Sequence, residues 1–145
     1  MLRSARGGEV LSVPQMERSS DAVVPATLDA AAVGALVDLL GGDRDALAEL
    51  AAVFAAEVPD RIAEMRAAGA QSTDAALARR AGHTLKSNAL TFGALELGAS
   101  AHRVEIAGSV GDLDEVARLV PEVESAWLAV KPAVLRLGEG NADER

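Results

Sequence analysis

Apolar side chains recur every three to four residues in five consecutive stretches of this chain, which is the spacing of helices that bury one face. The composition agrees, because 31 of the 145 residues are alanine, the strongest helix former. The chain holds one Trp, two Phe and no Tyr, whereas strands pack through aromatic and β-branched residues. An all-β fold is therefore excluded, and the length fits one domain.

Capping residues, glycines and prolines set the expected boundaries of these helices. Pro59 should kink or divide the second helix, because proline lacks a backbone N–H, and Pro121 and Pro132 should kink the fifth. Asp112 and Glu115 form a variant of the capping box at the start of the fifth. The expected helices run from Thr27 to the Gly41–Gly42 pair, from Asp43 past Met65, from the Ser72–Asp74 region to Phe92, from Ala94 to Ala107 with a stop at Gly108, and from Asp112 to Leu137.

Short connections between long amphipathic helices predict an all-α fold, namely an antiparallel helical bundle. The bundle is expected to occupy residues 26–137, with flexible tails at residues 1–25 and 138–145. Either Met1 or Met16 could be the translation start. A bundle whose last helix covers its own core is expected to be a monomer.

Charge and residue types exclude several function classes. The formal net charge of -8 argues against nucleic acid as the main partner, because such binding depends on neutralising phosphates. The chain has no cysteine and two histidines, so few side chains of the types that commonly ligate metals are present. No apolar run approaches the roughly 18 residues of a membrane span, and the N-terminus lacks the apolar core of a signal peptide. A cytoplasmic location is therefore expected. No nucleotide-binding motif of a kinase is present.

The third predicted helix carries the most informative surface. At about 100° per residue, His83 lies roughly 200° from Leu85 on the apolar stripe, so it should point to solvent. No acidic residue occurs from Ala75 to Leu95, so an anion could approach. The neighbouring cations, Arg79, Arg80 and Lys86, should favour the neutral form of the His83 imidazole, which is a competent nucleophile. An ordinary solvated face explains the same pattern. The residues within about 60° of His83 are Arg79, Arg80, Lys86 and Ser87.

The string His83-Thr84-Leu85-Lys86-Ser87, followed by Phe92-Gly93-Ala94, resembles the signature of histidine-containing phosphotransfer (HPt) domains of bacterial phosphorelays. That signature reads His-x-Leu-Lys-Gly, with a Gly-Ala or similar pair closing the helix. The segment from Phe54 to Ile62 resembles the preceding helix of the family, and the run from Ala101 to Glu105 resembles the following one. The resemblance covers about Leu28 to Leu137. It implies a four-helix bundle with an additional short N-terminal helix.

The resemblance also implies roles for individual residues. His83 would be the phosphoacceptor, and Lys86 would stabilise the phosphoryl group. Glu105 would face the phosphoacceptor helix and accept a hydrogen bond from one ring nitrogen of His83, which leaves the other free to attack. A solvated glutamate is an equally good interpretation of Glu105. His102, near Glu105 on the helical wheel, is expected to be a plain surface histidine.

A docking surface for partner proteins would surround His83. Leu90 lies within about 20° of His83 on the helical wheel, so it is a candidate apolar contact. Arg79, Arg80 and Ser87 complete this expected docking face, with Ser87 replacing the usual glycine. The implied partners are response-regulator receiver domains and a hybrid sensor kinase. The chain itself would need no cofactor, and Mg²⁺ would be held by the receiver.

Three functions of different classes remain open. The first is a phosphocarrier that accepts a phosphoryl group on His83 from one receiver aspartate and passes it to another. The second is a non-catalytic adaptor that docks receivers through the basic face without transfer. The third is an enzyme that uses His83 as a general base, and it ranks last because an open helix face does not exclude water.

Overall fold

The structure is a computed structural model that describes residues 26–71 and 74–143, and the predicted tail at residues 1–25 lies outside this part. Every regular element in the described residues is a helix, so the predicted all-α fold is confirmed. The helices are α3 (Ala30–Leu39), α4 (Arg44–Gln71), α5 (Ala75–Thr91), α6 (Leu95–Ser109) and α7 (Leu113–Asp143).

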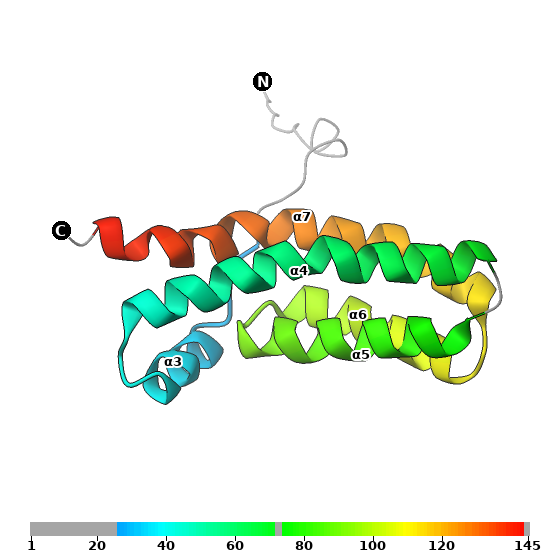
Figure 1. Cartoon of the computed structure of the whole chain (residues 1–145), viewed down its shortest axis with the longest axis horizontal. Coiled ribbons are helices and arrows are strands. Elements are labelled where there is room, and N and C mark those ends of the chain that lie inside the picture. The colour runs from blue at the N-terminus through cyan, green and yellow to red at the C-terminus, as the bar shows by residue number, and fades with distance from the viewer. Residues whose placement is uncertain (1–25, 72–73, 144–145) are drawn as a thin grey trace, which may run out of the picture.

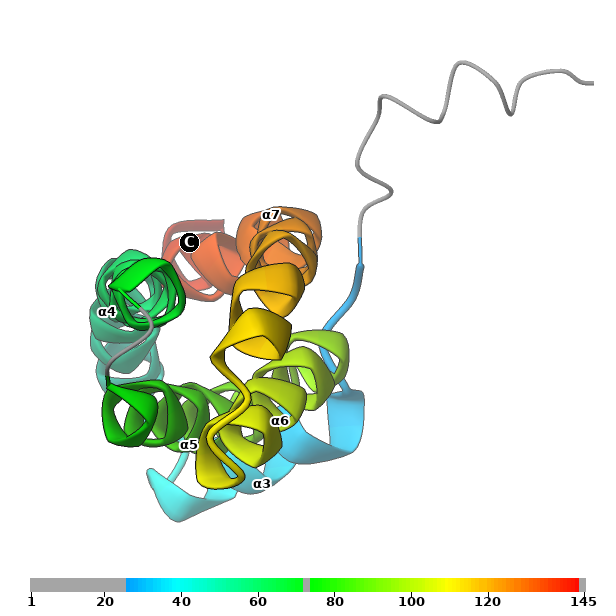
Figure 2. The ribbon, with the colours of Figure 1, turned by 90° about the vertical axis from the view of Figure 1, so that its right-hand side faces the viewer.

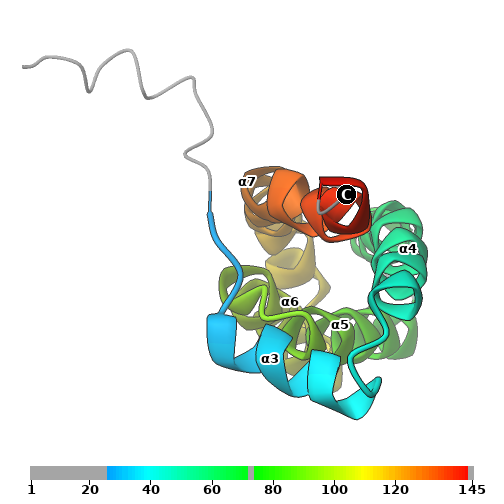
Figure 3. The same ribbon diagram turned by 90° about the vertical axis from the view of Figure 1, so that its left-hand side faces the viewer.

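Four of these helices, α4 to α7, form the bundle, and α3 is the additional short helix. Figure 1 shows α4 beside α7 and α5 beside α6 as two layers, with α3 at one end. Seen end-on, the four long helices surround a common centre (Figure 2). From the opposite end, α3 lies across the ends of α5 and α6 (Figure 3). The closest packing is between α4 and α7 and between α5 and α6.

The core is aliphatic, with one small aromatic cluster. Phe54 of α4 stacks on Phe92 at the end of α5 with ring centroids 4.7 Å apart. Trp127 of α7 meets Phe54 edge to face at 5.9 Å. Three helices therefore meet at this cluster, where the stacked and edge-to-face ring contacts stabilise the fold beyond the burial of apolar surface. The largest fully buried side chains include Leu47, Met65, Leu85, Leu97 and Leu119.

The start of α3 differs from the prediction. Asp29, not Thr27, caps the helix, because its side chain accepts a hydrogen bond from the Ala32 N–H at 3.1 Å. The Asp29 N–H in turn donates to the Gly93 carbonyl at 2.8 Å. Thr27 lies in the preceding extended segment, where the Ala26 N–H donates to the Ala129 carbonyl of α7 at 2.9 Å. These bonds tie α3 to both layers.

The prolines do not divide their helices. Pro59 lies inside α4, and Pro121 and Pro132 lie inside α7. All three are exposed, so the buried face of each helix packs without interruption. That packing offsets the roughly 3 kcal/mol cost of an interior proline.

Two predicted helix ends were wrong, and both fell at glycines. Gly108 lies within α6, and the turn instead comes at Gly111, whose φ is 77°. Gly138 lies within α7, which continues past Leu137 to Asp143. The predicted tail at residues 138–145 is therefore helical as far as Asp143. An interior glycine costs a helix only about 1 kcal/mol, so it is a weak stop signal.

The predicted capping box at Asp112 is half formed. The Glu115 N–H donates to the Asp112 side chain at 3.0 Å, which satisfies one free donor at the start of α7. The Glu115 carboxylate does not return the bond, because the Asp112 N–H donates to the Ala107 carbonyl at 2.9 Å. The carboxylate instead accepts from the Arg118 guanidinium at 2.8 Å and 2.5 Å. Among the described helices, none is both long and apolar enough to cross a membrane.

Candidate functional site

The outward position of His83 follows from the way α5 is built. Asp74 caps the helix by accepting from the Leu77 N–H at 2.9 Å, and the side that includes Leu85 is buried against the bundle. His83 lies away from that side, and its side chain is 57% exposed. The helical-wheel prediction for His83 is confirmed.

Two glycines let α6 approach α5 closely enough to reach His83. A Cβ atom on Gly82 would lie 2.6 Å from the Glu105 backbone nitrogen and 2.8 Å from the Ala101 carbonyl oxygen. A Cβ atom on Gly108 would lie 2.6 Å from the Arg79 backbone nitrogen. The helices therefore pack backbone against backbone. Because Gly82 directly precedes His83, this contact places Glu105 beside the imidazole.

Four side chains meet at this point, and we call them the Glu105 cluster: Glu105, His83, Lys86 and His102. Glu105 Oε2 lies 2.9 Å from His83 Nδ1. Glu105 Oε1 lies 2.8 Å from Lys86 Nζ and 3.4 Å from His102 Nδ1. The carboxylate is 19% exposed and thus lies beneath more exposed imidazoles. Of the two ring nitrogens of His83, Nδ1 is the one engaged.

The electrostatics of the cluster keep Glu105 ionised. Its pKa is lowered to about 2, mainly by the hydrogen bond from Lys86 and further by those from His83 and His102, while partial desolvation opposes the shift. Ionised Glu105 is an acceptor only. It therefore favours the imidazole tautomer that carries its proton on Nδ1 and leaves Nε2 with a free lone pair.

The contact between Glu105 and His83 is the one that the family resemblance implies, and the structure adds His102 to it. The surface of α5 lacks acidic residues, but α6 supplies Glu105, so His83 is not surrounded by cations alone. His102, predicted to be a plain surface histidine, contacts Glu105 Oε1. The sequence spacing could have indicated this contact, because His102 and Glu105 are three residues apart on one helix and so share a face.

The remaining predicted residues lie around the cluster without a hydrogen bond to it. Arg79 and Arg80 are exposed one helical turn before His83, and Ser87 is exposed one turn after it. Leu90 is 43% exposed. Its other side packs on α6, since a Cβ atom on Gly98 would lie 2.7 Å from Leu90 Cδ2. These residues thus flank an open imidazole on the outer face of α5.

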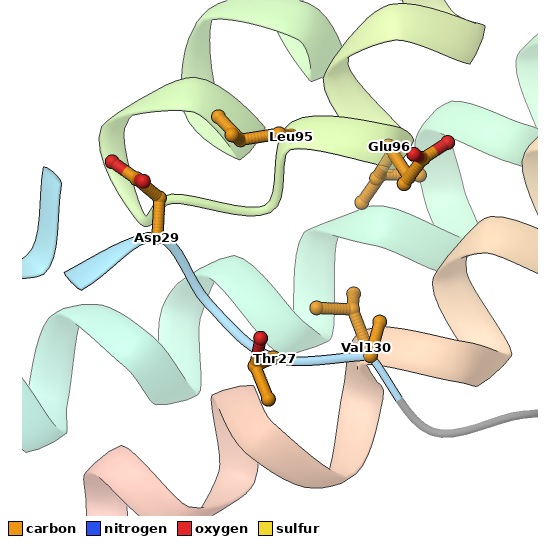
Figure 4. Close-up of a pocket in the computed structure, with 7 residues that line it drawn as sticks. Thr27, Asp29, Leu95, Glu96 and Val130 are labelled. Carbon is orange, nitrogen blue, oxygen red and sulfur yellow. The ribbon is translucent and has the colours of Figure 1, made fainter.

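The pocket drawn in Figure 4 is separate from this site. It has a volume of about 440 Å³, and the segment before α3 closes one side of it. None of its lining residues belongs to the Glu105 cluster. In the described part of the chain, no group of three or more His, Cys, Asp or Glu side chains is arranged to hold a metal ion. The lining residues are Ala26, Thr27, Asp29, Leu95, Glu96, Leu97 and Val130.

The comparisons with known proteins identify the family. The family model of the Hpt domain matches residues 49–133, which include α5, α6 and the whole Glu105 cluster. Neither the curated proteins nor the solved structures that were compared with the chain gave a match. The family match covers more than half of the chain and agrees with the helical bundle. The chain therefore belongs to the Hpt domain family, whose members take part in phosphotransfer in two-component signalling and interact with receiver domains.

Proposed function

We propose that this protein accepts a phosphoryl group on Nε2 of His83 from the aspartyl phosphate of one receiver domain and passes it to the aspartate of another. The observation that carries this proposal is the 2.9 Å contact between His83 Nδ1 and Glu105 Oε2. A carboxylate on Nδ1 selects the tautomer in which the exposed Nε2 is nucleophilic.

The proposed transfer is a single nucleophilic displacement at phosphorus. The Nε2 lone pair attacks phosphorus, an N–P bond forms, and the P–O bond to the receiver aspartate breaks to release its carboxylate. The Nδ1 proton stays on the ring, where Glu105 compensates the positive charge that develops. Transfer to the second receiver is the same displacement in reverse. Such chemistry needs an in-line nucleophile and charge compensation more than covalent help from the protein.

Lys86 and the partner divide the task of charge compensation. Lys86 lies one helical turn after His83 on the same face, so its ammonium can turn from Glu105 to the phosphoryl oxygens. Mg²⁺ is proposed to enter with the receiver, which holds it in its own acidic site. The chain itself is proposed to work without a cofactor and without ATP, as a phosphocarrier rather than an enzyme.

The docking face is proposed to consist of the residues around the imidazole. Arg79 and Arg80 give it positive charge towards an acidic receiver, Leu90 gives it an apolar contact, and Ser87 is small enough to let the partner approach. A hybrid sensor kinase and response regulators are the proposed partners, and the protein is proposed to act as a cytoplasmic monomer.

The test is transfer from a phosphorylated receiver domain in the presence of Mg²⁺. Wild-type protein should gain a label that is lost in acid and stable in alkali, as expected for a phosphoramidate, and His83→Gln should gain none. His102→Gln is the matched control, because it removes the other imidazole of the chain. Receiver binding without label on the wild type would instead support a non-catalytic adaptor. Label that persists in His83→Gln would assign the chemistry to another residue.

A further inference from the structure

The Glu105 carboxylate has one more partner than the proposed transfer uses. Its Oε2 atom faces His83, while Oε1 is shared between Lys86 Nζ at 2.8 Å and His102 Nδ1 at 3.4 Å. A carboxylate oxygen can accept more than one hydrogen bond. Lys86 is the nearer donor, so His102 is the secondary partner of this oxygen while His83 carries no phosphoryl group.

Phosphorylation would change which donor is available. The phosphoryl oxygens would form on the exposed side of His83, and Lys86 is the cation that can reach both Glu105 and that side. If Lys86 turns to the phosphoryl group, Glu105 Oε1 loses its main partner. A second donor on Oε1 would then help to keep Oε2 on His83 Nδ1, where the ring holds its proton as the phosphoryl group leaves.

His102 is placed to be that donor. It lies three residues before Glu105 on α6, its Nδ1 is already 3.4 Å from Oε1, and its side chain is 50% exposed rather than enclosed by the bundle. Glu105 on its own helix is the charged group that contacts it, and His83 and Lys86 of α5 contact the same carboxylate. The next residue of α6, Arg103, is paired with Glu122 of α7 at 3.2 Å. Among the described residues, no other cation contacts Glu105.

We propose that His102 is a positioning residue, which takes over Glu105 Oε1 when Lys86 turns to the phosphoryl group and so keeps the carboxylate on His83 Nδ1. This inference rests on the proposed function, since it describes how the phosphorylated state is held. It assigns to His102 no contact with the phosphoryl group itself.

The first experiment tests the exchange of donors and needs no phosphate. The NMR signal of the His102 Nδ1–H group, which reports its hydrogen bond, is recorded in wild type, Lys86→Ala, Glu105→Gln and the double variant. Without Lys86, His102 should gain Glu105 Oε1, and this signal should move downfield as the hydrogen bond strengthens. The change should be absent when Glu105 is already replaced. An equal change in both backgrounds would overturn the proposal, because it would reflect only the lost lysine charge.

The second experiment tests the consequence for transfer. His83 is phosphorylated with phosphoramidate, a small-molecule donor, and phosphoryl transfer to a receiver domain is timed across pH. His102→Ala should slow transfer by about threefold to tenfold, less than the loss of a direct acid–base group. His102→Gln, which keeps a neutral donor, should restore most of the rate and give a flatter pH profile than wild type.

The controls separate this inference from the proposed function. Arg103→Ala removes a neighbouring cation of α6 that does not contact Glu105, and its rate should match wild type. A wild-type rate and pH profile in His102→Ala would refute the positioning role while leaving the phosphocarrier intact. Failure of wild type to transfer at all would refute the phosphocarrier, whereas the first NMR experiment would still decide whether His102 replaces Lys86.

Discussion

At the scale of single residues, Glu105 organises the site although it is not the proposed nucleophile. It contacts His83, Lys86 and His102 at once, and its low pKa keeps it ionised over the whole physiological range. The side chains around it are all at least partly exposed, so the cluster is open to a partner. The outward position of His83 could be predicted from the helical wheel, because it depends only on α5. Its contact with Glu105 could not be derived from the helical wheel, because it depends on how closely another helix packs, and it was implied only by the family resemblance.

The state of Glu105 gives a prediction about pH. Since its pKa is lowered from 4.5 to about 2, the contribution of Glu105 to folding stability is fully present above pH 4.5. It is lost as pH falls through about 2. Replacing Lys86 with alanine should move the titration midpoint of the Glu105 carboxyl back towards its ordinary value, because Lys86 is the main cause of the shift. The measurement is carboxyl NMR across pH.

The control for this titration is Lys131→Ala, which removes the other lysine of the chain from an exposed position on α7. It should leave the Glu105 midpoint unchanged. A midpoint near 4.5 in the wild type would show that the cluster does not form in solution.

At the scale of helices, the close contact between α5 and α6 brings Glu105 to the exposed His83 and so forms the candidate site. The existence, order and approximate extent of the helices could be predicted from apolar periodicity, which reflects burial along each helix. The predicted ends at Thr27, Gly108 and Gly138 were wrong, because local stop and start signals of about 1 kcal/mol yield to packing. Gly82 shows the same limit, since its role in close packing is set by residues 19 and 23 positions further along the chain, Ala101 and Glu105 of α6.

The close packing of these helices gives a prediction about stability. Gly82→Ala should lower the free energy of unfolding by about 1–3 kcal/mol, because its Cβ would meet backbone atoms that cannot rotate away. The same change at Gly34 of α3, where nothing lies within 4 Å of the added atom, should raise stability by about 0.5–1 kcal/mol. Urea unfolding measures both. Equal effects of the two substitutions would contradict backbone-to-backbone packing of α5 on α6.

At the scale of the whole molecule, the charge is divided unevenly. The chain carries a formal net charge of -8, yet the surface of α5 around His83 carries Arg79, Arg80 and Lys86 and no acidic residue. A partner with an acidic site is thus attracted to one face of an otherwise acidic molecule. This asymmetry could be read from the sequence, because it depends on a single helix. The Glu105 cluster spans two helices, so its contact between Glu105 and His83 was implied only by the family resemblance, and the presence of His102 in it was not predicted.

This charge distribution gives a prediction about binding. Affinity for a receiver domain should fall as salt is added, because the attraction between exposed charges is screened. Arg79→Glu should weaken binding by about tenfold at low salt and by less at high salt. Arg136→Glu on α7 makes the same change of charge at an exposed position outside the docking face, and calorimetric titration should find a much smaller effect. Equal losses for the two variants would mean that receivers do not dock on α5.

The most direct test of the central claim follows the phosphoryl group out of the protein as well as into it. Wild-type protein is labelled by one phosphorylated receiver, separated from it, and mixed with an unphosphorylated second receiver and Mg²⁺. The label should leave His83 and appear on the receiver aspartate faster than it is lost as free phosphate. Release at the same rate with and without the second receiver, across several receivers, would contradict a carrier that passes phosphoryl groups between them.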